Sequence, residues 1–144
     1  KIIEFVKNQK HFDLFFDKIT NLFDKMLSGF KDEEKDLFEP NGGAESHLRL
    51  AAYYLLNAKT EGGQPRDPVA RFHLNNGALV AALNANADTS KNGMAQSCGV
   101  MVNYKYDLAR ISDHHEAFAN QQTVISEKFI KNLAAEIGNL GTFD

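Results

Sequence analysis

His73 is the strongest candidate for a residue that moves a proton, because the pKa of an imidazole lies near the range useful for proton transfer. It lies in the segment Asp67-Pro68-Val69-Ala70-Arg71-Phe72-His73-Leu74-Asn75-Asn76-Gly77-Ala78. A short helix that fed directly into a strand would hold this ring rigidly. A lone histidine on a short helix is more often structural or exposed than catalytic, so both interpretations stay open from the spacing alone.

Two tyrosines, Tyr104 and Tyr106, are a second candidate pair. They alternate in Val102-Asn103-Tyr104-Lys105-Tyr106, and alternating residues share one face of a strand. A phenol both donates and accepts hydrogen bonds, so the pair could face a ligand. Strand aromatics more often fill a core, and this remains the first interpretation of the pattern.

Other reactive residue types give weaker patterns. His114-His115-Glu116 resembles a metal site at first sight, but adjacent histidines diverge on a helix or strand and no second cluster has ligand spacing. Cys98 has no base nearby in sequence, so we expect it to pack in the interior. The chain contains no serine nucleophile elbow and no phosphate-binding glycine loop. We therefore expect no metal site from these residues.

Composition bounds the class of protein. The chain has 144 residues, is 43% hydrophobic and carries a formal charge of −3. This length supports one modest core, and the charge argues against nucleic acid as the main partner. No apolar run is long enough for a membrane span, and a single cysteine fits a reducing compartment. Because the first residue is Lys1 and the start is already apolar, we expect a piece of a longer polypeptide.

Helical periodicity marks the first half of the chain. Apolar residues recur at intervals of three and four from Phe12 to Leu27, which predicts an amphipathic helix. Lys31 to Gly43 is charged and then rich in turn formers, as in a solvated connector. A second helix is predicted from Glu45 to Lys59, burying Leu48, Ala51, Ala52, Leu55 and Leu56.

The segment around His73 has clear helix boundaries. Asp67 can cap free amides, Pro68 suits the first helical position, and Gly77 suits the left-handed residue past the end. These features predict a short helix from Pro68 to Asn76. Asn75-Asn76-Gly77 between apolar residues is also a hairpin signal, which is the competing interpretation.

The second half predicts strands and a last helix. Two strands are predicted, from Ala78 to Leu83 and from Val100 to Tyr106. The polar connection between them has room for a helical turn. A last helix is expected from about Ser126. Its predicted apolar face consists of Phe129, Ile130, Leu133, Ala134 and Ile137. The fold class is therefore α+β, and we expect strands outside this chain to complete the sheet, since two strands alone are unstable.

Several of these segments together resemble successive motifs of the malonyl-CoA decarboxylase family, in the right order. The matching segments are Asp67 to Ala78, Asp88-Thr89-Ser90, Gln96 to Leu108, and His115-Glu116-Ala117-Phe118. The resemblance covers about 50 residues closely. It implies the C-terminal part of a catalytic domain similar to the acetyltransferase superfamily. Residues 45–144 would form this part, and residues 1–44 a helical segment and connector.

The resemblance also implies roles for particular residues. His73 matches the family's catalytic histidine and Tyr106 a tyrosine of its active site, while Tyr104, Asn75 and Arg71 are expected to bind substrate. The family also uses a serine in a Ser-Pro motif well upstream of the histidine. No such motif precedes His73 in this chain. At position 85 this chain has Ala85, where the family tends to carry a bulky aromatic.

The implied reaction converts malonyl-CoA to acetyl-CoA and carbon dioxide. It needs stabilisation of an enolate and delivery of a proton to carbon, and no cofactor besides the CoA of the substrate. The alternatives are a non-catalytic acyl-CoA-binding or assembly module and an acyltransferase on the same fold. We expect a homo-oligomer formed through the helical segments, no nucleic acid or membrane partner, and a cytoplasmic location, or the mitochondrial matrix in a eukaryote.

Overall fold

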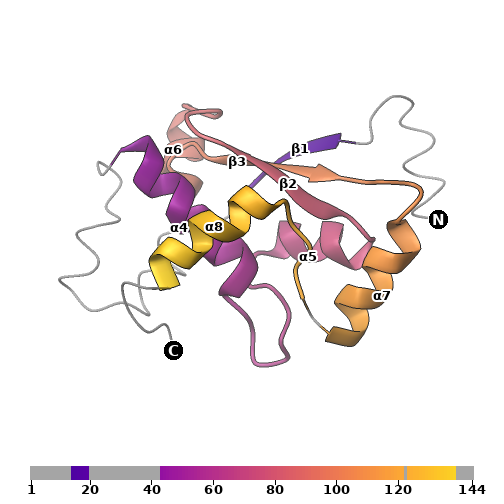
Figure 1. Ribbon diagram of the computed structural model, residues 1–144. Coiled ribbons are helices and arrows are strands. Elements are labelled where there is room, and N and C mark those ends of the chain that lie inside the picture. The colour runs from indigo at the N-terminus through magenta and orange to yellow at the C-terminus, as the bar shows by residue number, and fades with distance from the viewer. Residues whose placement is uncertain (1–13, 20–42, 122, 139–144) are drawn as a thin grey trace.

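A computed structural model describes residues 14–19, 43–121 and 123–138 of the chain (Figure 1). The described residues form an α+β arrangement of strands β1 (Leu14–Lys18), β2 (Leu79–Asn84) and β3 (Met101–Lys105) with helices α4 (Ala44–Asn57), α5 (Pro68–Asn75), α6 (Lys91–Ser97), α7 (Ile111–Gln121) and α8 (Lys128–Gly138). This confirms the predicted class. None of the described helices is long and apolar enough to cross a membrane.

Strand β3 is the centre of the sheet. The strand order is β1-β3-β2, and both outer strands run antiparallel to β3. The predicted strands after Gly77 and after Gly99 are confirmed as β2 and β3. Alternation also holds, because Val100, Val102, Tyr104 and Tyr106 are all buried. One face of β3 therefore supplies both tyrosines to the interior.

The helix predicted from Phe12 to Leu27 is wrong over its described part. Leu14–Lys18 is strand β1, which pairs with β3 from Leu14↔Lys105 to Lys18↔Met101. Phenylalanine suits a strand, and pairing with the free edge of β3 outweighs a local helical period. Residues 12–13 and 20–27 of that segment, and the connector up to residue 42, lie outside the described residues. At least one strand that we expected from outside the chain therefore comes from within it.

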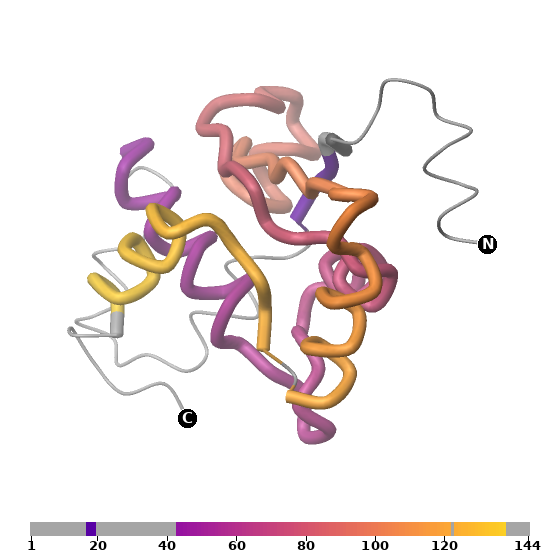
Figure 2. Tube along the Cα trace, turned by 45° about the vertical axis from the view of Figure 1, so that its right-hand side comes forward, coloured from indigo at the N-terminus to yellow at the C-terminus, as the bar shows by residue number. Residues whose placement is uncertain are grey.

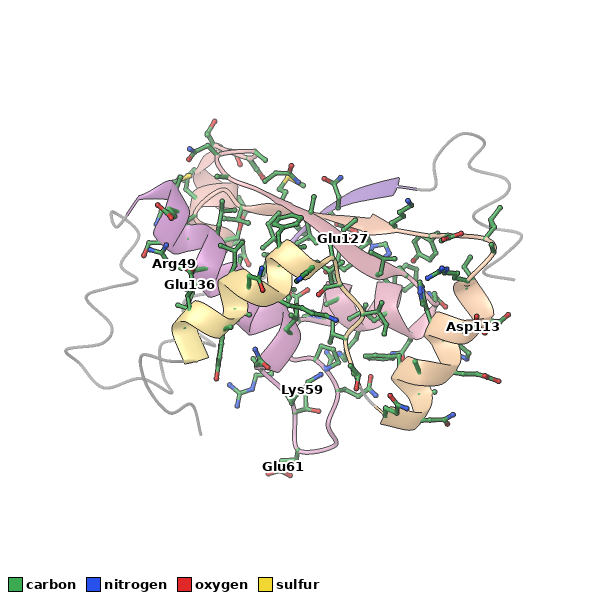
Figure 3. The ribbon with its side chains drawn as sticks, viewed as in Figure 1. Arg49, Lys59, Glu61, Asp113, Glu127 and Glu136 are labelled. Carbon is green, nitrogen blue, oxygen red and sulfur yellow. The ribbon has the colours of Figure 1, made fainter. Side chains whose placement is uncertain are left out.

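Helices cover one face of the sheet. In Figures 1 and 2, α4 lies beside α8 and α5 beside α7, all on the same side of the strands. The predicted helix α4 is confirmed. Of its five predicted buried residues, Ala51, Ala52 and Leu55 are fully buried, whereas Leu48 and Leu56 are partly buried against the core. Arg49 of α4 lies 3.5 Å from Glu136 of α8, linking the two helices at the surface (Figure 3). The apolar faces of the helices and the β3 face together form one core.

The last helix is confirmed with two corrections. Ile130, Ala134 and Ile137 of α8 are buried as predicted, but Phe129 is 51% exposed. Phe129 is rotated about 100° around the helix from Ile130, which places it at the edge of the buried face. The helix begins at Lys128, and the Ser126 hydroxyl donates to the Glu127 carbonyl. Ser126 therefore lies just before the helix, and its hydroxyl contacts a carbonyl rather than a helix amide.

Helix α7 was not predicted. Its buried residues are Ile111 and Phe118, which lie seven residues apart. The remaining surface of the helix is polar. Two buried positions in a helix of 11 residues are too few to give a recognisable helical period in the sequence. The polar connection after β2 does contain a short helix, α6, followed by Cys98 in a left-handed conformation. Cys98 is buried as expected, and burial raises the pKa of its thiol to about 11.

Helix α5 has the predicted ends. The Asp67 carboxylate accepts a hydrogen bond of 2.9 Å from the Ala70 amide, and Pro68 is the first helical residue. Gly77 has a φ of +90°, as predicted for the residue past the end. Its missing side chain also matters for packing, because an added Cβ would lie 2.7 Å from the Ile111 carbonyl oxygen. Gly77 thus lets α5 end against the start of α7.

Gly77→Ala is expected to destabilise the fold by about 2–4 kcal/mol, because a positive φ costs about 1–2 kcal/mol and overpacking costs a similar amount. Urea denaturation followed by circular dichroism measures this loss.

Two control variants separate the causes. Gly43→Ala has a φ of +96° but nothing within 4 Å, so it isolates the backbone cost. Gly62→Ala has neither problem and should shift stability by less than about 0.5 kcal/mol. An equal loss for Gly77→Ala and Gly43→Ala would contradict the proposed contact with Ile111.

Candidate active site

His73 lies in the last turn of α5, where the helix passes beneath β3. The capped start and the glycine end fix this short helix, and the Ala78 amide donates to the His73 carbonyl 3.1 Å away. The residue is only 2% exposed. A buried imidazole needs partners for its nitrogens, since an unsatisfied polar group in the interior costs free energy.

Both ring nitrogens have such partners. Nδ1 lies 2.6 Å from the Tyr106 hydroxyl, and Nε2 lies 3.0 Å from Oδ2 of Asp17. A carboxylate can only accept, so Nε2 donates to Asp17 in the neutral ring. Nδ1 then accepts from Tyr106. The result is a carboxylate, an imidazole and a phenol in one hydrogen-bonded line.

Aromatic rings enclose the imidazole on its other sides. Tyr104 stacks on it with centroids 4.3 Å apart and planes at 20°. Phe72 and Tyr106 approach it edge to face, at 5.1 and 5.7 Å. Such pairs stabilise one orientation of the ring beyond the area they bury. The orientation of His73 is therefore set by stacking and by hydrogen bonds together.

Burial dominates the electrostatics of the site. Desolvation lowers the pKa of His73, although the hydrogen bond and charge of Asp17, and the charge of Asp67, act in the opposite direction. Burial raises the pKa of Tyr106 and, well above its usual range, that of Tyr104. At neutral pH the site therefore holds a neutral imidazole and two protonated phenols.

Two buried hydroxyls keep hydrogen-bonding capacity. Those of Tyr104 and Tyr54 have no hydrogen-bond partner among the described residues. The charge of Asp67 contributes to the raised pKa of each, which places all three groups in one region. The Tyr104 hydroxyl thus remains able to bond a polar group of a ligand, which is the property its predicted role requires.

The other predicted substrate-binding residues do not join this cluster. The exposed Asn75 donates to Gln64 at 3.4 Å, and its carbonyl accepts from the His115 ring at 2.8 Å. Arg71 is half-buried, and its backbone amide donates to the Asp67 carbonyl. Residues two positions from His73 on a helix point away from it. The structure therefore brings Tyr104 and Tyr106 to His73, but neither Arg71 nor Asn75.

Histidines 114 and 115 lie on α7. Across the described ranges, no three His, Cys, Asp or Glu side chains form a group that could hold a metal ion. Nδ1 of His114 is buried and without a partner in the described residues, whereas the exposed His115 contacts Asn75. The pair therefore diverges, as expected for adjacent residues.

Sequence reasoning missed Asp17. The expected helix placed this residue on its polar, solvent side. In the structure Asp17 lies opposite Val102 in the register of β1 and β3, on the same sheet face as Tyr104 and Tyr106. Only the strand pairing reveals this position, and no local pattern around Asp17 signals it.

Comparison with known families gives one match over most of the chain. The family described as "Malonyl-CoA decarboxylase C-terminal domain" matches residues 25–140. The mitochondrial malonyl-CoA decarboxylase of Mus musculus is 37% identical over 92 residues, which is 64% of this chain and 18% of that protein. That of Rattus norvegicus is 37% identical over 89 residues, covering 62% and 18%. The chain thus spans less than a fifth of these relatives.

Solved structures show the same likeness. The crystal structure of malonyl-CoA decarboxylase from Agrobacterium vitis matches with a TM-score of 0.75 and 31% identity, over 92% of this chain and 39% of that one. The enzyme from Rhodopseudomonas palustris matches with a TM-score of 0.72 and 30% identity, over 83% and 32%. The arrangement of helices on a small sheet therefore recurs in larger proteins.

The lowered pKa of His73 predicts a pH dependence of stability. The unfolded ring titrates near its ordinary value of 6.5, and the folded ring titrates below it. The unfolded state then binds more protons in the interval between the two, so stability is present above about pH 6.5 and falls as the pH drops toward the folded pKa. Urea midpoints between about pH 7 and 5 measure the slope.

A His73→Gln variant provides the comparison. It should have a smaller slope in this interval than the unsubstituted chain, whatever its absolute stability, because the titrating ring is gone. Equal slopes would show that His73 does not titrate with an altered pKa.

Proposed function

Because the chain belongs to the malonyl-CoA decarboxylase family, we propose that it forms part of an active site that converts malonyl-CoA to acetyl-CoA and carbon dioxide. The observation that carries this proposal is the buried His73 ring, bonded through Nδ1 to Tyr106 and stacked on Tyr104. Two residues that the family resemblance pairs are thus in direct contact. The chain contains part of the enzyme, so the activity belongs to the complete polypeptide.

The reaction explains why this site holds a neutral imidazole. Loss of carbon dioxide leaves electrons on the thioester as an enolate, which must be stabilised and then protonated at carbon. The Nε2–H of His73 can donate to the thioester oxygen, where negative charge develops, when that oxygen shares this N–H with Asp17 or takes the place of the Asp17 carboxylate. A water-poor site strengthens such a bond and prevents unwanted proton exchange.

The residues take different parts in this proposal. His73 is the hydrogen-bond donor and proton carrier, and Tyr106 holds its ring through Nδ1. The unpartnered hydroxyl of Tyr104 supports a contact with the acyl group. A serine from a Ser-Pro segment would complete the site from outside these residues. Arg71 and Asn75 remain proposed contacts to more distant parts of the substrate.

The larger setting is also proposed. We infer a domain similar to the acetyltransferase superfamily, formed by residues 45–144 with further strands from outside the chain, preceded by a segment over residues 1–44. We also propose that the protein assembles into a homo-oligomer through its helical segments. No cofactor beyond the CoA of the substrate is required. Two relatives are named as mitochondrial proteins, which supports the mitochondrial alternative, and a cytoplasmic location stays a proposal from the sequence.

One observation favours a second candidate function. Nε2 of His73 is occupied by Asp17, and the ring is enclosed by aromatic residues. A site arranged this way could bind an acyl-CoA without turning it over. The alternative is therefore a non-catalytic acyl-CoA-binding module.

His73→Asn in the complete polypeptide is expected to lower the rate of carbon dioxide release by about 10²–10⁴-fold, because a general acid or base contributes that much. Binding of acetyl-CoA, followed by calorimetry, should change little. Carbon dioxide and acetyl-CoA are measured after addition of malonyl-CoA.

His114→Asn is the matched control, since this half-exposed histidine lies on α7 outside the hydrogen-bonded line. It should retain the parent rate. An unchanged rate in the His73 variant would refute the assigned role, and binding without product in the parent enzyme would favour the module.

A further inference from the structure

We propose that Asp17 is a positioning residue of this site, whose carboxylate selects the tautomer of His73 in which Nε2 carries the proton. The contact that supports this is the 3.0 Å separation between Nε2 and Oδ2 of Asp17. The family match covers residues 25–140, so Asp17 lies outside the part of the chain that it describes.

Tyr106 alone cannot select a tautomer. Its hydroxyl lies 2.6 Å from Nδ1 and can either donate to that nitrogen or accept from it. An ionised carboxylate has no proton to donate, so the Asp17 contact requires Nε2–H. The carboxylate therefore decides which way the Tyr106 hydrogen bond points.

The sheet places Asp17 by backbone pairing. Asp17 is opposite Val102 in the antiparallel register, two residues along β3 from Tyr104, and so shares the face that carries both tyrosines. The Asp17 side chain is 41% exposed, whereas that of His73 is 3% exposed. A substitution at Asp17 therefore leaves no buried cavity, and the variant is expected to fold.

Four titratable groups surround the imidazole. Asp17 comes from β1, Asp67 from the cap of α5, and the phenols of Tyr104 and Tyr106 from β3 and the residue that follows it. Both carboxylates favour the protonated ring, whereas burial opposes it. Removing the charge of Asp17 is therefore expected to lower the pKa of His73 further.

The test uses the complete polypeptide with ¹⁵N-labelled histidine and an isosteric variant, Asp17→Asn. An amide can either donate or accept, so the variant keeps the shape but loses the selection of one tautomer. We expect imidazole ¹⁵N shifts of a single Nε2–H tautomer in the parent and of a mixture in the variant. The pKa of His73 measured in the same titration should fall.

Two further variants frame the result. Asp17→Glu keeps the acceptor and is expected to restore the Nε2–H tautomer, at least in part. Asp113→Asn removes a carboxylate from α7, at the opposite end of the helical layer from Glu136 in Figure 3. This control should leave the tautomer and the pKa of His73 unchanged. A parent ring protonated at Nδ1, or an Asp17→Asn ring with unaltered tautomer and pKa, would overturn the proposal.

The effect on turnover rests on the proposed function. Asp17→Asn is expected to lower kcat by about 10–100-fold with KM nearly unchanged, as for other partners that orient a functional histidine. If the parent polypeptide releases no carbon dioxide, the proposed function fails, while the ¹⁵N measurement still judges the role of Asp17. If the parent is active and Asp17→Asn is equally active, the positioning role in catalysis is wrong.

Discussion

The structure depends on keeping one imidazole buried with both nitrogens bonded. His73 loses its hydration when α5 packs beneath β3, and an unbonded nitrogen there would cost about 1–3 kcal/mol. Tyr106 and Asp17 remove that cost from opposite sides of the ring, and Tyr104 stacks on its face. Strand β3 and the residue that follows it supply the two tyrosines, and pairing with β3 positions Asp17. The central strand is therefore the element on which the candidate site is built.

Local signals predicted the parts of the site that neighbours in sequence determine. The Asp67 cap and the positive φ of Gly77 fix α5 within about ten residues, and both follow from backbone chemistry. Alternation likewise placed Tyr104 and Tyr106 on one face of β3, because the side-chain period of a strand does not depend on its partners. The contact between His73 and Tyr106 required only that this helix cover this face.

Nonlocal pairing explains what the sequence could not reveal. Phe12 to Leu27 has a helical period, yet Leu14–Lys18 pairs with β3, and no local pattern shows that an edge is free. Asp17 became part of the site through this pairing, 56 residues from His73 in sequence. Helix α7 was missed because its sequence shows too few apolar positions. Two buried residues are enough to hold it in place, since it packs against α5. Tertiary contacts decided both segments.

The balance of charges around His73 bears on the proposed chemistry. Burial lowers its pKa more than Asp17 and Asp67 raise it, so the ring is neutral. In the proposed reaction, a neutral N–H would polarise the thioester carbonyl, as a neutral imidazole polarises a substrate carbonyl in other enzymes. A cationic ring would also attract the carboxylate of malonyl-CoA and stabilise it, and charge must leave that carboxylate during the reaction. In the proposed reaction, an enclosed, neutral imidazole would favour the enolate over the ground state, which is the difference that catalysis requires.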